Sequence, residues 1–377
     1  SPQPQASVVL MDQYTGEVKA IVGGRGDKTA SKTLNRATDT TRQPGSTFKI
    51  LAAYSAALDA GGLTLASVQD DAPYTYAGAN GKSVNNYDRR YRGFTTLREA
   101  ITDSINIVTV KTLAQAGVSL GWQYVQEYGF TTVDSRDMNE ALALGGITQG
   151  VSNLELTAAY AAIANQGTYI KPKFYTKILD HDGNVLIDNT TPESHTVIKD
   201  TTAWLLTSAM EDVMTSGTGT SAYFGSSMAQ AGKSGTTTSS RDALFAGYTP
   251  YYTCAVWGGY DDNAMQKGSD TNYPKRIWKA VMKRIHENLA YKDFTKPSGI
   301  VAVAVCKESG KLPIEGVCDH DPRGNCVITE YFAQGTEPTE YCDHHTVANI
   351  CTASNMLAGS YCPAETITTG VYVTGGS

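Results

Sequence analysis

The chain of 377 residues is long enough for one large domain and a smaller one. Its 31 lysine and arginine residues and 37 acidic residues give a net charge of −6, which argues against a nucleic-acid-binding surface. The charged fraction of 18% excludes a disordered or coiled-coil chain, and no apolar stretch reaches the roughly 20 residues that cross a bilayer.

The predicted elements begin with strands and continue with helices. Residues 6–24 contain two β-rich runs around a Tyr-Thr-Gly turn, which predicts a hairpin. Apolar residues on a helical period predict helices in four segments, 47–60, 95–117, 153–166 and 201–219. The second of these has Thr96 as its expected N-cap and Gly117 as its stop, and polar residues from Thr102 to Ser104 interrupt it midway.

Further β-rich runs follow in residues 227–262, and residues 276–290 predict a last helix with one apolar face. Short connections between neighbouring strands favour antiparallel pairing. We therefore expect an α/β (α+β) fold. It consists of an antiparallel sheet of about five strands built from the two ends of the domain, flanked by helices and carrying an inserted helical lobe.

The sequence changes near Pro297 to cysteines, turns and short strands. We place a boundary there, between a domain of residues 1–296 and a small β-rich extension of residues 297–377. The extension contains all but one of the cysteines: Cys306, Cys318, Cys326, Cys342, Cys351 and Cys362. An even set of cysteines predicts disulfides in an oxidising, extracytoplasmic setting, with no pairing assigned. The segment "YCDHH" supports zinc as the alternative, but no Cys-x-x-Cys pair accompanies it, and the histidines are interpreted as surface or structural residues.

The segment "RQPGSTFK" places Ser46 after a Pro-Gly turn at the expected start of a helix, with Lys49 three residues later. Residues three apart share a helix face, so the amine of Lys49 is expected beside the hydroxyl of Ser46. The unpaired N–H groups of a first helical turn can bind a developing oxyanion. Taken alone, Ser46 is better explained as a simple helix cap.

A lysine acts as a base at neutral pH only if burial and a nearby positive charge lower its pKa from about 10.4. The segment "GKSGTTT" supplies that second cation, Lys233, on an expected edge strand. Glycines at Gly232 and Gly235 allow another backbone to approach this strand. Hydroxyl groups beside Lys233 come from Ser234, Thr236 and Thr237.

A third polar group, Ser104 with Asn106, lies where the second predicted helix is interrupted. Asn106 is alternatively a local cap for the helix that follows. A second Ser-x-Asn, formed by Ser83 and Asn85, shows that this motif is not unique in the chain. In this order, Ser-x-x-Lys, Ser-x-Asn and Lys-x-Gly form a signature shared by class A β-lactamases and penicillin-binding proteins.

Beyond these motifs, nearly the whole chain resembles the transpeptidase domain of class A penicillin-binding proteins. The resemblance is strongest in "NRATDTTRQPGSTFK", "NNYDRRYRGFTTLREAITDSIN", "ALALGGITQGVSNLELTAAYAAIANQGTYIKP" and "AGKSGTTTSSRDALFAGYTP". The segment "TEYFAQGTEPTEYCDHH" resembles the C-terminal extensions of some Gram-positive members. The resemblance implies a β-lactamase/transpeptidase-like fold.

It also implies that Ser46 attacks the carbonyl between the terminal D-alanines of a peptidoglycan stem peptide, while Lys49 accepts the serine proton. Ser104 would relay a proton to the leaving D-alanine, and Asn106 would hold the substrate amide and Lys49. The amine of an acceptor stem peptide would then take the acyl group from the acyl-enzyme. A β-lactam would acylate Ser46 in place of the donor peptide.

In the same resemblance, Lys233 keeps the local potential positive and helps to bind the substrate carboxylate. The oxyanion hole is implied to be the backbone N–H groups of Ser46 and Thr236. The implied substrate-binding residues are Ser234, Gly235, Thr236 and Thr237. No metal ion and no cofactor are expected at this site. Two departures from the family pattern are minor: Ile105 is central in the middle motif, and Ser234 stands where threonine is common.

The resemblance further implies an enzyme at the outer face of the bacterial cell membrane, with other cell-wall synthesis proteins as partners. The family's membrane anchor and N-terminal glycosyltransferase domain are absent from the sequence, so we expect an excised or processed fragment. A D,D-carboxypeptidase or β-lactamase on the same scaffold remains an alternative, as does a sensor that binds β-lactams or peptide without turnover. No loop carboxylate is identified that would activate water, which favours transpeptidation.

Overall fold

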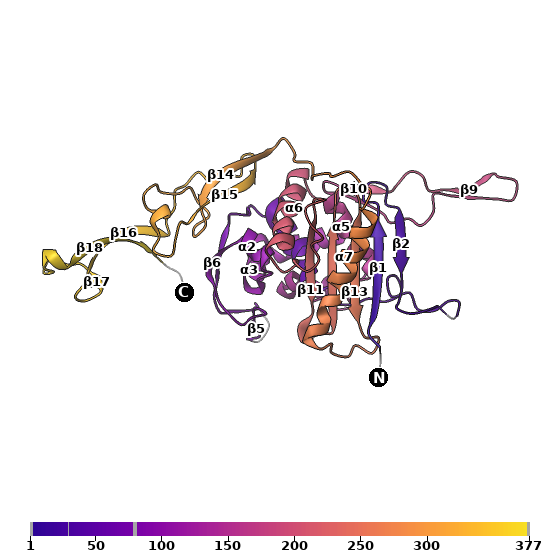
Figure 1. Ribbon diagram of the computed structural model, residues 1–377, viewed down its shortest axis with the longest axis horizontal. Helices are drawn as coiled ribbons and strands as arrows, with labels where there is room; N and C mark the ends of the chain where they lie inside the picture. The colour runs from indigo at the N-terminus through magenta and orange to yellow at the C-terminus, as the bar shows by residue number, and fades with distance from the viewer. Residues whose placement is uncertain (1–2, 29, 78–80, 375–377) are drawn as a thin grey trace.

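The structure is a computed structural model that describes residues 3–28, 30–77 and 81–374. Figure 1 shows a central sheet covered by helices, with an elongated extension to one side. The sheet has five strands in the order β11-β12-β13-β1-β2, and all neighbours are antiparallel. Their bounds are β1 (Gln5–Met11), β2 (Val18–Val22), β11 (Ala231–Thr236), β12 (Asp242–Tyr248) and β13 (Thr253–Gly259).

The sheet confirms the expected antiparallel arrangement and joins the two ends of the domain, because β1 pairs with β13 over its whole length. Strands β12 and β13 are buried at every position, since helices cover both faces of the sheet. Strand β11, which carries Lys233, lies at the edge as predicted. One side of β11 is therefore available for pairing with another extended chain.

The helices that cover the sheet are α5 (Asn153–Ala164), α6 (Asp200–Thr215) and α7 (Tyr273–Ile285), close to the predicted segments. A capping box starts α5, in which the side chain of Ser152 accepts from the N–H of Glu155 and the side chain of Glu155 accepts from the N–H of Ser152. On the other face, Trp278 and Met282 of α7 are fully buried against the sheet. These helices hold the strands in place around the edge strand.

The helical lobe contains α1 (Ser55–Asp59), α2 (Leu97–Thr102), α3 (Asn106–Ala116) and α4 (Val118–Glu127). As predicted, the side chain of Thr96 caps α2, and Gly117 ends α3 with a φ of 108°. The predicted interruption is a complete break, because α2 ends at Thr102 and α3 begins at Asn106.

The helix predicted at residues 47–60 differs from a regular α-helix. It consists of a 3₁₀ turn, η1 (Gly45–Thr47), a π-helical segment, η2 (Lys49–Tyr54), and α1. The N–H of Ser55 donates to the carbonyl of Ile50, and the hydroxyl of Ser55 donates to the same oxygen at 2.8 Å. This five-residue spacing gives a wider turn, and such turns occur frequently at functional sites.

The described part of the domain also has four small two-stranded sheets, and none of them was predicted. Figure 1 shows one of them, which contains β9, projecting far from the sheet. The pairs are β3 (Val68–Asp71) with β6 (Gly93–Thr96), β4 (Tyr74–Thr75) with β5 (Ser83–Val84), β7 (Thr168–Ile170) with β10 (Ser194–Thr196), and β8 (Lys177–Leu179) with β9 (Val185–Asp188). Among the described residues, no helix is both long enough and apolar enough to cross a bilayer.

The C-terminal extension is built from two small sheets. The strands are β14 (Ile300–Cys306) with β15 (Val327–Ala333), and β16 (His345–Cys351) with β17 (Met356–Leu357) and β18 (Ile367–Val373). The first sheet packs on the helical lobe, where Arg98 of α2 forms an ion pair with Glu330 of β15 at 2.7 Å. The boundary near Pro297 stays a prediction.

The cysteines of the extension differ from the expectation. All seven cysteines of the chain lie in its described part, and all are free thiols, so the predicted disulfides are not observed. Instead, Cys306, Cys318 and Cys342 converge on the buried ring of His345. A disulfide joins only two sulfurs, so any pairing among these three thiols would leave one of them over beside the imidazole. The arrangement therefore differs from a disulfide framework.

Candidate active site

The candidate active site begins at the turn before Ser46. Gly45 has a φ of 55°, a left-handed conformation that favours glycine. The turn lies between two backbones, because a Cβ atom added to Gly45 would be 3.1 Å from the carbonyl oxygen of Thr236, and one added to Gly145 would be 2.5 Å from the carbonyl oxygen of Gly45. Ser46 follows, half-buried, with its backbone beside the end of β11.

Two side chains before Ser46 fix this turn to the rest of the domain. Arg42 donates to the carboxylate of Asp242 on β12 at 2.7 Å and lies 4.9 Å from the ring centre of Trp257. Gln43 accepts from the N–H of Ile147 at 3.1 Å and donates to the carbonyl of the same residue. The position of Ser46 therefore depends on contacts made about 100 and 200 residues away along the chain.

Lys49 is fully buried, and its amine donates to three oxygens of the segment between α2 and α3. The acceptors are the carbonyl of Ser104 at 2.6 Å, the hydroxyl of Ser104 at 3.2 Å and the amide oxygen of Asn106 at 2.7 Å. All three are neutral, so no carboxylate stabilises a charge on this amine. Ser46 lies three residues before Lys49 in the same helical run.

The break between α2 and α3 presents Ser104 to both lysines. Ser104 has a φ of 57°, a strained conformation for a residue with a side chain, and such strain concentrates at functional sites. Its hydroxyl accepts from the amine of Lys233 at 2.8 Å as well as from Lys49. Ser104 is thus a hydroxyl bridge between the two amines, as a proton relay requires.

Burial changes the acid–base properties of both lysines. The pKa of Lys49 is well below its usual value, because the amine is desolvated and because the charge of Lys233 lies nearby. Burial and the charge of Lys275 lower the pKa of Lys233 to about 7. Neither amine has an ion-pair partner among the described residues. Burial and a neighbouring cation are the two features that a lysine base needs at neutral pH, and Lys49 has both.

Asn106 does not cap α3, contrary to the alternative interpretation. The cap is the side chain of Asn86, whose oxygen accepts from the N–H groups of Asn106 at 3.0 Å and Ile107 at 3.2 Å. The side chain of Asn106 is used differently, because its oxygen binds Lys49 and its nitrogen donates to the carbonyl of Asn85 at 2.6 Å. Asn85, the last residue of the second Ser-x-Asn, therefore lies beside the site and holds the side chain of Asn106 through its carbonyl.

The predicted substrate-binding residues on β11 divide into two groups. The hydroxyl of Ser234 donates to that of Thr218 at 2.9 Å, and the hydroxyl of Thr237 accepts from the N–H of Asp242 at 2.9 Å. Gly235 accommodates this chain's own turn, because a Cβ atom there would lie 2.6 Å from the carbonyl oxygen of Pro44. Thr236 is exposed at the end of the strand. Of the four, Thr236 is the only one that is exposed.

Several residues that shape the site were missed by sequence reasoning, namely Arg42, Gln43, Asn86, Gly145 and Thr218. Asn86 and Thr218 act through hydrogen bonds to residues at least 16 positions away, and local spacing carries no signal for such contacts. Gly145 has a φ of 77°, a left-handed conformation that favours glycine. Its close approach to the turn before Ser46 was not foreseen.

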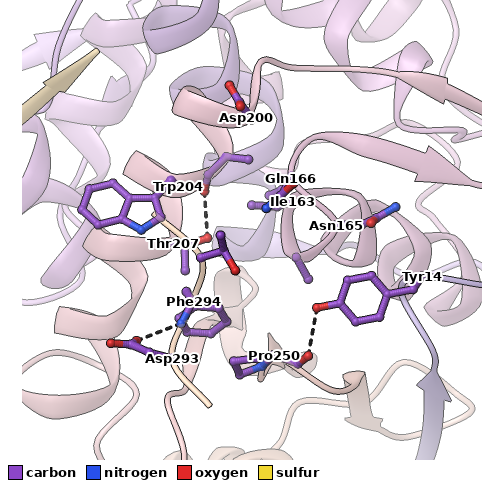
Figure 2. Close-up of a pocket in the computed structure, with 13 residues that line it drawn as sticks. Tyr14, Ile163, Asn165, Gln166, Asp200, Trp204, Thr207, Pro250, Asp293 and Phe294 are labelled. Carbon is purple, nitrogen blue, oxygen red and sulfur yellow. Dashed lines mark hydrogen bonds between the residues drawn. The ribbon is translucent and has the colours of Figure 1, made fainter. Parts of the chain in front are cut away.

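A cavity is found elsewhere in the molecule. It has a volume of about 240 Å³ and lies between the end of α5, the start of α6 and residues 293–295. Figure 2 shows Tyr14, Trp204, Thr207 and Phe294 around it. None of Ser46, Lys49, Ser104 and Lys233 lines this cavity. The geometry and chemistry of the lysine cluster, rather than cavity size, identify the candidate active site.

Comparisons with known proteins agree with this architecture. The crystal structure of penicillin-binding protein 1A from Haemophilus influenzae superposes with a TM-score of 0.77 at 27% identity, over 90% of this chain and 54% of that one. PonA1 from Mycobacterium tuberculosis in complex with penicillin V gives 0.66 at 25% identity, over 79% of this chain and 82% of that one. The fold is thus that of a penicillin-binding transpeptidase domain.

Sequence comparisons specify the family. Penicillin-binding protein 1A of Clostridium botulinum (strain Langeland) is 37% identical over 98% of this chain, and the chain spans 46% of that protein. The family model "Penicillin binding protein transpeptidase domain" matches residues 6–286, and "Penicillin-binding protein 1A, C-terminal domain" matches residues 296–347. The chain therefore belongs to the penicillin-binding protein transpeptidase family.

Proposed function

We propose that this chain is a serine D,D-transpeptidase that cross-links peptidoglycan stem peptides through an acyl-enzyme on Ser46. The observation that carries the proposal is the buried amine of Lys49, which lies within one helical turn of Ser46 and has only neutral hydrogen-bond partners. Membership of the family supports the same activity. Peptidoglycan as the substrate is supported by membership of this family.

In the first step, the hydroxyl oxygen of Ser46 attacks the carbonyl carbon of the penultimate D-alanine, and its proton passes to the neutral amine of Lys49. The negative oxygen of the tetrahedral intermediate is bound by the N–H groups of Ser46 and Thr236. The C–N bond then breaks, and the proton reaches the departing nitrogen of D-alanine through the hydroxyl of Ser104, which contacts both lysines.

In the second step, the amine of an acceptor stem peptide attacks the ester carbonyl and the C–O bond to Ser46 breaks. The proton of the amine passes through Ser104 and Lys49 to the oxygen of Ser46, which regains its hydroxyl. Lys233, with Thr236 and Thr237, binds the carboxylate of the donor, which lies along the free edge of β11. Asn106 holds the donor amide while it orients Lys49. Ser234 and Gly235 act through the protein, since Ser234 contacts Thr218 and Gly235 contacts the turn before Ser46.

Hydrolysis is the alternative fate of the acyl-enzyme. Fast hydrolysis needs a general base that activates water near the ester. None of the hydrogen bonds of Lys49, Ser104 and Lys233 among the described residues involves a carboxylate. This arrangement favours a long-lived ester that awaits an amine. We extend the proposal to covalent inhibition by β-lactams and to action outside the cell membrane, with a glycosyltransferase domain and an anchor in the longer protein.

The test is a pair of assays on the purified chain. A fluorescent penicillin is expected to label the protein with the adduct on the peptide that contains Ser46, and Ser46→Ala is expected to abolish labelling. Ser83→Ala, in the second Ser-x-Asn, is the matched control and is expected to label normally. Labelling of Ser46→Ala at the wild-type level would refute the assignment of the nucleophile.

The second assay separates the possible activities. Polymerised glycan with pentapeptide stems is incubated with the chain and the muropeptides are analysed by mass. Cross-linked dimers with release of D-alanine are the expected result. Release of D-alanine without dimers contradicts transpeptidation and indicates a carboxypeptidase, and penicillin labelling with no product of either kind indicates a sensor.

A further inference from the structure

The cysteine-rich extension contains a cluster of four potential metal ligands. The thiols of Cys306, Cys318 and Cys342 and a ring nitrogen of His345 all lie within 4.8 Å of one another, and all four residues are buried. Cys306 ends β14, Cys318 begins the short 3₁₀ turn η7 (Cys318–His320), and His345 begins β16. The cluster thus joins segments of the extension that are far apart in the sequence.

Two separations within the cluster are close to those of a tetrahedral site. Sγ of Cys306 and Sγ of Cys342 each lie 3.4 Å from Nδ1 of His345. Zinc binds thiolate sulfur at about 2.3 Å and imidazole nitrogen at about 2.0–2.1 Å, which for a tetrahedron places sulfur and nitrogen about 3.6 Å apart. These two pairs would thus shift by only a few tenths of an ångström on binding a metal ion, and all four ligand atoms already lie within 4.8 Å of one another.

The other face of His345 is arranged as in metal-binding histidines. Its Nε2 lies 2.9 Å from the carboxylate of Asp321, whose side chain is fully buried. Arg323 orients that carboxylate by donating to both of its oxygens, at 3.0 Å and 2.8 Å. A histidine that donates through one nitrogen to a carboxylate directs the lone pair of its other nitrogen to a metal. Here that nitrogen faces the thiols.

One of the sulfurs also accepts a hydrogen bond from the backbone. The N–H of Ile314 donates to Sγ of Cys318 at 3.2 Å. Backbone donors of this kind stabilise ionised sulfur, which is the form that binds metal.

We infer that Cys306, Cys318, Cys342 and His345 bind one structural zinc ion. Three thiolates and one imidazole form a closed, four-coordinate donor set that suits zinc and leaves no position for a substrate. A disulfide would engage two of the three sulfurs and leave the third, with the oriented imidazole, unexplained. Cys351 and Cys362 contact each other away from the cluster and are the pair still suited to a disulfide. The inference does not depend on the proposed enzymatic function.

The position of the cluster gives the ion a structural role. His344, next to the ligand His345, stacks on Phe94 of β6 with ring centres 4.1 Å apart. Figure 1 shows that this part of the extension lies beside β6 and α2. All four ligands lie within residues 296–347, the segment that matches the C-terminal domain family. The ion would therefore hold the loops of this domain together and keep His344 against the helical lobe.

The test uses the whole 377-residue chain, purified under reducing conditions and supplied with zinc. Elemental analysis is expected to give one zinc per chain after removal of excess metal. Cys318→Ser and His345→Ala are each expected to reduce this to less than a tenth, measured under the same conditions. Cys326→Ser is the matched control, because Cys326 lies next to His345 and Asp321 but outside the ligand set, and it is expected to keep the full zinc content.

A second measurement remains informative if a variant fails to fold. Cobalt(II) added to the reduced wild-type chain is expected to produce the thiolate charge-transfer and intense visible bands of a tetrahedral sulfur-rich site, and zinc is expected to displace it. Absence of these bands together with no retained zinc overturns the inference. So does a disulfide that involves Cys306, Cys318 or Cys342 in peptide mapping of protein purified without reductant, or loss of zinc in Cys326→Ser.

Discussion

At the scale of single residues, the two buried lysines set the chemistry of the site. Lys49 and Lys233 share the hydroxyl of Ser104, and neither has a carboxylate partner among the described residues. Burial is the chief cause that lowers the pKa of both amines. The first of the two to titrate therefore loses its proton at a pH at which an exposed lysine would still be charged. Charge in this cluster is therefore controlled by desolvation.

This arrangement predicts a bell-shaped pH profile for acylation by penicillin. The rate is expected to rise as Lys49 loses its proton and to fall as Lys233 loses its own, with a pKa of about 7 in the free enzyme. Lys233→Arg keeps the charge at every accessible pH and is expected to remove the falling limb. A falling limb that persists in that variant would show that another group titrates.

The same pKa shifts predict how stability changes with pH. Between pH about 7 and the ordinary lysine value of 10.5, the unfolded chain binds more protons than the folded one, so the free energy of unfolding rises with pH in this window. Chemical denaturation of the wild type and of Lys233→Met measures the difference. The variant is expected to show a smaller rise, because one of the shifted groups is gone.

At the scale of elements, glycine allows the turn before Ser46 to touch the edge strand β11. Gly235→Ala would place a methyl group 2.6 Å from the carbonyl oxygen of Pro44 and 2.9 Å from Cγ2 of Thr47, so the turn must move. We expect acylation to slow by at least about tenfold, because small misplacements of a nucleophile are costly. Gly268→Ala, which meets open space, is the control and is expected to acylate normally.

Acylation by fluorescent penicillin and thermal unfolding should be measured together for both variants. A loss of acylation with a nearly unchanged melting temperature indicates that the turn has moved. Normal acylation in Gly235→Ala would contradict the conclusion that this contact positions Ser46.

The sequence predicted these elements unevenly, for physical reasons. Periodicity and turn residues located the five-stranded sheet and helices α5, α6 and α7, because their signals are local. The π-helical segment η2 was not predicted, since its spacing depends on Ser55, whose hydroxyl also contacts Tyr128 at 2.8 Å. Asn86 as the cap of α3 was missed because it precedes that helix by 20 residues.

The proposed zinc ligands show a different limit of prediction from the sequence. The sequence contains no Cys-x-x-Cys pair, but Cys342 and His345 form a Cys-x-x-His pair. The third and fourth ligands, Cys306 and Cys318, become recognisable as a set only when the fold brings the loops together. The segment "YCDHH" thus nominated half of the site, as the alternative to disulfides, and tertiary structure was needed for the rest.

At the scale of the whole molecule, one arginine joins the extension to the helical lobe. Arg98 of α2 donates to Glu330 of β15, whose side chain is fully buried, and to Asp212 of α6, whose side chain is 42% exposed. Since α2 ends two residues before Ser104, the extension is packed on the element that leads into the active site.

The two partners of Arg98 are expected to contribute unequally. Glu330→Gln removes one member of a buried pair and is expected to lower the free energy of unfolding by on the order of 3 kcal/mol. Asp212→Asn removes a partly exposed member and is expected to cost at most about 1 kcal/mol. Urea unfolding of the two variants measures the difference, and equal losses would contradict a dominant role for the buried pair.

The open edge of β11 poses a hazard that the chain must limit, because an unpaired strand can join a strand of a second molecule and start aggregation. Inward-pointing charges are one of the devices by which proteins protect such edges. Lys233 is a lysine on the edge strand with its side chain buried, and Gly232 and Gly235 weaken the strand as a partner for ordinary sheets. The residues that we propose to receive the donor peptide at this edge thus also make it a poor template for self-association.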